Sequence, residues 1–83
     1  MDEREELKLK LEQELQWVQY RQKMLDIIDD KLIQMRELAE QAKQGNLAIG
    51  ELESLNNRLN NLVAQVRAID SESRKIEDGK ILQ

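Results

Sequence analysis

The chain has 83 residues, of which 36% are charged, a formal net charge of −4, and no cysteine, histidine, proline or phenylalanine. Disulfides and the usual zinc ligands are therefore excluded, and a fold this small depends on regular helix packing or on association. The sequence is acidic overall and lacks the basic patch that binds nucleic-acid phosphates, so we expect no nucleic-acid binding. No apolar run approaches the length of a membrane span, and we expect a cytoplasmic protein that does not bind membranes.

The first predicted element is a long helix over residues 3–44. Its apolar residues recur at the 3.5-residue spacing that is typical of a coiled coil. The predicted a positions are Leu11, Val18, Leu25, Leu32 and Ala39, and the d positions are Leu7, Glu14, Arg21, Ile28, Met35 and Ala42.

A turn over residues 45–50 follows, in which Gly45 is expected to take the positive φ common just past a helix C-terminus. A second helix is predicted over residues 51–77, with a short tail at 78–83. Its a positions are Leu52, Leu59, Val66 and Ser73, and its d positions are Leu55, Leu62, Ile69 and Ile76.

The two heptad patterns match one another across the turn. In an antiparallel hairpin the numbers of facing residues sum to a constant, and a sum of 94 sets an a residue against a d residue in every layer. The sequence therefore predicts an all-α fold, a single antiparallel coiled-coil hairpin over residues 1–83 that associates into a helical bundle. The predicted hairpin core is Leu25, Ile28, Leu32, Met35, Ala39, Leu52, Leu55, Leu59, Leu62, Val66 and Ile69.

The same register places polar Arg21 opposite polar Ser73, so the two helices turn polar at the same level. One interpretation is that Arg21 pairs with Glu14, Glu72 or Ser73 and fixes the register, as single polar core residues do in coiled coils. The alternative is an arginine that contacts a partner protein.

The first helix also carries apolar residues that are predicted to lie outside the hairpin core. Its N-terminal part has little of its own chain to lie against, and a second apolar line follows, which contains the only two aromatic residues. We predict that these residues contact protein: Leu7, Leu11, Leu15, Trp17, Tyr20, Met24 and Ile27. The contact is the core of a homodimer or four-helix bundle, a patch that binds a different protein, or a membrane-surface helix.

No residues are arranged for catalysis, for metal binding or for a cofactor. We predict a non-enzymatic interaction module, a self-associating hairpin that acts as adaptor, chaperone or scaffold, with a dimer or tetramer of hairpins and an unidentified protein as partners. The alternatives are a purely structural bundle and a phosphatase-type modulator. The segment 55–60 resembles small helical-hairpin phosphatases of sporulation regulators in its hydrophobic spacing, but it has none of their polar motif residues.

Overall fold

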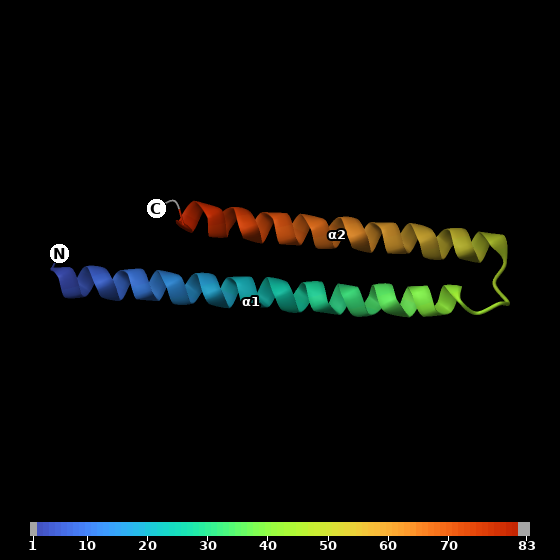
Figure 1. Ribbon diagram of the computed structural model, residues 1–83, viewed down its shortest axis with the longest axis horizontal. Coiled ribbons are helices and arrows are strands. Elements are labelled where there is room, and N and C mark those ends of the chain that lie inside the picture. Colours follow the sequence, from blue (N-terminus) through green and yellow to red (C-terminus); the bar gives the residue numbers. More distant parts are fainter. Residues whose placement is uncertain (1, 82–83) are drawn as a thin grey trace.

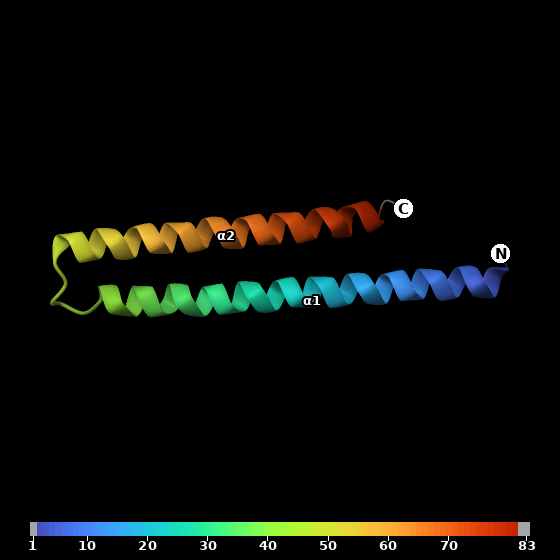
Figure 2. The same ribbon diagram turned by 180° about the vertical axis from the view of Figure 1, so that it is seen from behind.

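The protein is a two-helix hairpin, which confirms the predicted all-α fold class. The computed structural model describes the backbone of residues 2–81 and the side chains of residues 2–74. Helix α1 comprises Glu3–Ala42 and helix α2 comprises Ile49–Ile81. The helices lie antiparallel and side by side in both views (Figures 1 and 2). The molecule measures 68 × 17 × 11 Å, so it is a rod only two helices wide.

Helix α1 begins with a capped and negatively charged first turn. The carboxylate of Asp2 accepts a hydrogen bond from the backbone N–H of Glu5 at 2.7 Å. Glu3, Glu5 and Glu6 lie in the first turn. The cap satisfies one of the free N–H groups, and the acidic side chains interact favourably with the positive end of the helix dipole.

The connection between the helices differs from the expected glycine turn. Helix α1 ends at Ala42 rather than at residue 44, and α2 begins at Ile49 and continues past residue 77 to Ile81. No glycine among the described residues has a positive φ, so the conformation expected for Gly45 is wrong. The N–H of Lys43 donates to the carbonyl of Ala39 at 3.2 Å. The helix end is thus closed by an ordinary helical hydrogen bond, and a six-residue link makes the reversal without a left-handed residue.

Side-chain hydrogen bonds across the hairpin fix its register. Arg21 of α1 donates to the hydroxyl of Ser73 on α2, which is the pairing that the sequence predicts. Ten residues further along α1, Lys31 donates to the side chain of Gln65 at 2.6 Å. Both pairs lie within two positions of the predicted register.

The face that α1 turns toward α2 is not the predicted one. Arg21, Ile28 and Met35 lie inward, as predicted. The other inward residues, which alternate with these three along α1, are each one position earlier in the sequence than predicted. The inner face of α1 follows a 4–3 spacing through Trp17, Arg21, Met24, Ile28, Lys31, Met35 and Leu38, all buried or half-buried. Predicted core residues Leu25, Leu32 and Ala39 are exposed instead, with Leu25 and Leu32 at 43% and 46%. Helix α1 is therefore rotated by roughly 50° from the predicted orientation.

The two charged residues of the inner face have partners on α2 in this orientation. Arg21 and Lys31 lie roughly 80° apart around α1, and each donates to a polar side chain of α2. Arg21 belongs to the inward line in both the predicted and the observed orientation. The observed one brings Trp17, Met24 and Leu38 inward in place of the predicted Val18, Leu25 and Ala39.

Helix α2 follows the prediction more closely. Leu55, Leu59, Leu62, Val66 and Ile69 are all half-buried, as expected for the hairpin core. The exception is Leu52, which is 41% exposed. It lies in the first turn of α2 opposite small Ala42, where two helices alone leave a leucine partly uncovered.

The interface buries few side chains fully. Among the described residues only Ile28 and Leu38 are buried hydrophobic residues, at 8% and 4% exposure. The chain exposes 6929 Å², whereas a compact monomer of 9.8 kDa exposes about 5,200 Å². The hairpin therefore leaves about 1,700 Å² more surface in water than a globular chain of its size.

Two isoleucines in the middle of α1 test this assignment of faces. Ile28 is 8% exposed and Ile33 is 46% exposed. We expect Ile28→Ala to lower the free energy of unfolding by about 2–3 kcal/mol, because it removes buried methyl groups and leaves a cavity. Ile33→Ala is the matched control and should change it by about 0.5 kcal/mol or less. Urea denaturation followed by circular dichroism measures both, and equal losses would contradict the assigned faces.

Candidate protein-interaction surface

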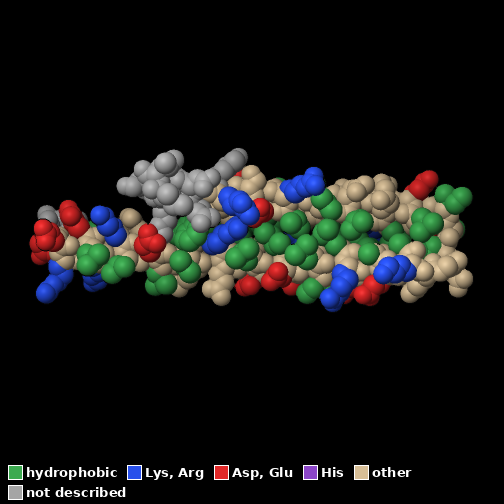
Figure 3. Space-filling view, in the orientation of Figure 1, with side chains coloured by type: hydrophobic (Ala, Val, Ile, Leu, Met, Phe, Trp, Pro, Cys, Tyr) green, Lys and Arg blue, Asp and Glu red, His purple; other side chains and the backbone are tan. Residues whose placement is uncertain are grey.

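The largest apolar feature of the surface is a stripe along the outer side of α1. We call it the outer stripe, and it consists of Leu7, Leu11, Leu15, Val18, Leu25 and Leu32. Each of these side chains is at least 43% exposed. Their spacing keeps them within about 100° of the helix circumference, which is the width of an apolar face that normally packs on another element. Figure 3 shows hydrophobic side chains on the part of α1 that extends past α2 and in a band along the line where the helices meet.

The structure divides the predicted protein-interaction residues into two groups. Leu7, Leu11 and Leu15 are exposed at 58%, 59% and 57% and belong to the outer stripe. The other four, Trp17, Tyr20, Met24 and Ile27, are half-buried on the inner side of α1. The indole Nε1 of Trp17 is out of contact with solvent. The predicted aromatic face and the hairpin face are therefore largely one surface, and the role of these four residues in partner binding stays a prediction.

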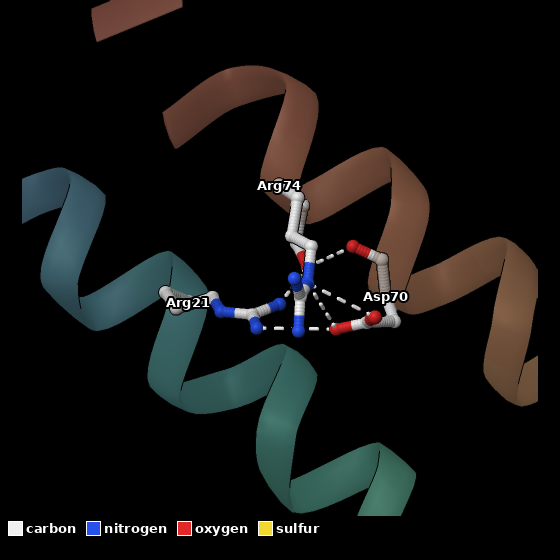
Figure 4. Close-up of polar contacts among 4 residues, drawn as sticks. Arg21, Asp70 and Arg74 are labelled. Carbon is white, nitrogen blue, oxygen red and sulfur yellow. Dashed lines mark hydrogen bonds and ion pairs between the residues drawn. The ribbon is translucent and has the colours of Figure 1, made fainter. Parts of the chain in front are cut away.

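A polar layer lies beside the outer stripe and crosses from α1 to α2 (Figure 4). The Nη2 of Arg21 donates to a carboxylate oxygen of Asp70 at 3.2 Å, and the Nε of Arg74 donates to the same carboxylate at 3.1 Å. Ser73, which is fully buried, accepts from Arg21 and donates to the backbone carbonyl of Asp70 at 3.2 Å. Each polar group of the layer thus has a partner, as buried polar groups require.

The hydrogen bonds from Arg21, and then those from Arg74, hold the pKa of Asp70 below its ordinary value. Charge-assisted hydrogen bonds favour the ionised carboxylate over the protonated acid. Asp70 is therefore ionised in the folded hairpin down to a lower pH than in the unfolded chain.

Sequence reasoning found part of this layer. It named Ser73 as a partner of Arg21, which is confirmed, but it did not name Asp70 or Arg74. The signal lay in the spacing: Asp70 precedes Ser73 by three residues and Arg74 by four, so all three share one side of α2. Leu38, the most buried hydrophobic residue among those described, is absent from the predicted hairpin core.

Among the side chains that the structure describes, those of residues 2–74, no group of three or more His, Cys, Asp or Glu is arranged to hold a metal ion. Neither described helix combines the length and apolarity that a membrane span requires. Comparison of the chain with protein-family models, curated proteins and solved structures yields no match.

The polar layer makes hairpin stability depend on pH through Asp70. Because its folded pKa is depressed, its contribution is fully present above about pH 4, the pKa of an unfolded aspartate, and is lost as the pH falls through the folded pKa. We expect Asp70→Asn to lower the melting temperature at pH 7. The difference in melting temperature between this variant and the parent chain should become smaller as the pH falls below about 4. Thermal melts at pH 7 and pH 3 measure this, and a gap that stays constant would contradict the pairing.

Proposed function

We propose that the protein is a non-enzymatic protein–protein interaction module, a self-associating coiled-coil hairpin that serves as an adaptor or scaffold. The observation that supports the proposal is the outer stripe. An amphipathic helix normally buries one apolar face, whereas α1 carries two and α2 covers only one of them.

The amount of exposed surface also supports association with a partner. The excess of about 1,700 Å² over a compact monomer is larger than the roughly 800 Å² that one partner contributes to a standard protein interface. An isolated interface with two buried hydrophobic side chains supplies little stability, so association would stabilise the hairpin as well as provide its function.

A second copy of the hairpin is the partner that the proposal names. The outer stripe lies roughly 100° around α1 from the inner face, so two chains joined by their outer stripes leave each α2 in its place. Self-association is a common way for small amphipathic hairpins to cover an exposed apolar face.

The proposal predicts an association that depends on the outer stripe. The parent chain should show a concentration-dependent dimer or larger oligomer in sedimentation equilibrium. Leu11→Glu combined with Leu15→Glu should raise the dissociation constant at least about tenfold, because each change places a charge in an apolar contact.

The matched control is Leu9→Glu combined with Ile49→Glu. Leu9 is 44% exposed on the side of α1 away from the outer stripe, and Ile49 is 77% exposed at the start of α2. The control adds the same charge, and we expect it to associate like the parent. Circular dichroism must show retained helix in both variants. A parent chain that is monomeric at all concentrations would contradict the proposal.

A further inference from the structure

We propose that two copies of the hairpin associate through their N-terminal arms, which pair antiparallel about Leu11. The N-terminal arm is the segment 3–15 of α1. The inference rests on the proposed self-association and adds to it the segment, the orientation and the centre of the contact.

The arm is the part of α1 that α2 does not cover. Figure 1 shows that α1 runs past the described end of α2. The leucines of the arm are also the most exposed in the outer stripe, since Leu7, Leu11 and Leu15 are 57–59% exposed while Val18, Leu25 and Leu32 are 43–47% exposed. A second helix therefore has free access to the arm from the side of Leu11.

These three leucines line one shallow groove with the charged side chains Arg4, Lys8 and Glu12. The groove is formed by a single helix, so nothing in the described chain closes it. Its floor is apolar, and Lys8 and Glu12 lie along one rim. An occupant that fits it presents leucines toward the floor and opposite charges toward the rim.

The arm itself has that pattern when it is reversed. In the sequence Leu7-Lys8-Leu9-Lys10-Leu11-Glu12-Gln13-Glu14-Leu15, the outer-stripe leucines Leu7 and Leu15 are placed symmetrically about Leu11. The charges change sign across the same centre, because lysines precede Leu11 and glutamates follow it. A two-fold axis at Leu11 sets Leu7 at the level of Leu15 of the second copy, and the lysine half of one arm beside the glutamate half of the other.

The side on which each charge lies supports the same pairing. One rim of the stripe carries Lys8 and Glu12, and the other carries Lys10 and Glu14. In an antiparallel pair of helices like rims meet. Each rim then has two lysine–glutamate neighbours between the copies, Lys8 with Glu12 or Lys10 with Glu14, and one pair of like charges at the axis. A parallel, in-register pair reverses this balance, with two pairs of like charges and one lysine–glutamate neighbour on each rim. The charges therefore select the antiparallel arrangement.

The first experiment measures orientation by cross-linking. The chain has no cysteine, so Leu7→Cys and Leu15→Cys each introduce a single thiol. An equimolar mixture of the two variants, one of them tagged, should give the mixed disulfide dimer several-fold in excess of either symmetric dimer on mild oxidation. Leu9→Cys, an exposed site on the other side of the arm, should give little dimer. Symmetric 7–7 and 15–15 disulfides in excess would overturn the proposal in favour of a parallel pair.

The second experiment measures the charge pattern and needs no covalent bond. Lys8→Glu combined with Lys10→Glu, and Glu12→Lys combined with Glu14→Lys, should each raise the dissociation constant of the chain alone by about tenfold or more. An equimolar mixture of the two should restore association to the parent level or above. Lys23→Glu combined with Arg58→Glu reverses two exposed charges outside the arm and controls for net charge.

The outcomes separate this inference from the proposed function. If the parent chain associates and the charge variants associate equally well alone and mixed, the arm pairing is overturned but self-association is not. A parent chain that remains monomeric overturns both. The arm pairing is supported if each charge variant alone loses association, if mixing the two variants restores it, and if the mixed disulfide forms.

Discussion

The arrangement of the hairpin depends on one polar contact, in which Arg21 of α1 meets Ser73 and Asp70 of α2. A guanidinium in a helix interface must be paired and hydrogen-bonded, because leaving it unpaired costs several kcal/mol. A shift of either helix by one heptad places Val66 or Lys80 opposite Arg21, and neither side chain can accept its hydrogen bonds. The contact therefore favours one register along the helices. In the observed rotation of α1, Arg21 also reaches Asp70.

That rotation determines which apolar residues remain outside. It brings Trp17 and Met24 toward α2 and leaves Leu25 and Leu32 in solvent. A hairpin held by apolar contacts alone would turn its leucines inward, since both lines of α1 have heptad spacing and the leucine line contains no lysine. The outer stripe is thus the leucine-rich line that the observed rotation of α1 leaves uncovered.

The antiparallel hairpin was predictable from the sequence, because two heptad patterns of matching register flank a single link. The pairing of Arg21 with Ser73 was predictable for the same reason. The inward face of α1 was not, because the observed inner face and the predicted core line share Arg21, Ile28 and Met35 and differ by one residue at every other position. The heptad pattern alone does not choose between them, and Asp70, which Arg21 contacts, lies outside the predicted a and d positions of α2. The exposed arm leucines were correctly placed outside the hairpin, since the unequal lengths of the helices leave them without a facing residue.

The two surfaces of α1 also differ in what they can recognise. The inner face is specific to α2, because its polar groups have matched partners at fixed levels. Most of the outer stripe lacks such partners, and leucines alone distinguish poorly between neighbouring helices. The arm is the exception, because Lys8, Lys10, Glu12 and Glu14 surround its leucines in an order that is complementary to itself only when reversed. Specificity along α1 therefore comes from charged side chains in both contacts. Arg21 specifies the pairing of α1 with α2, and the charges of the arm specify a second copy that runs in the opposite direction.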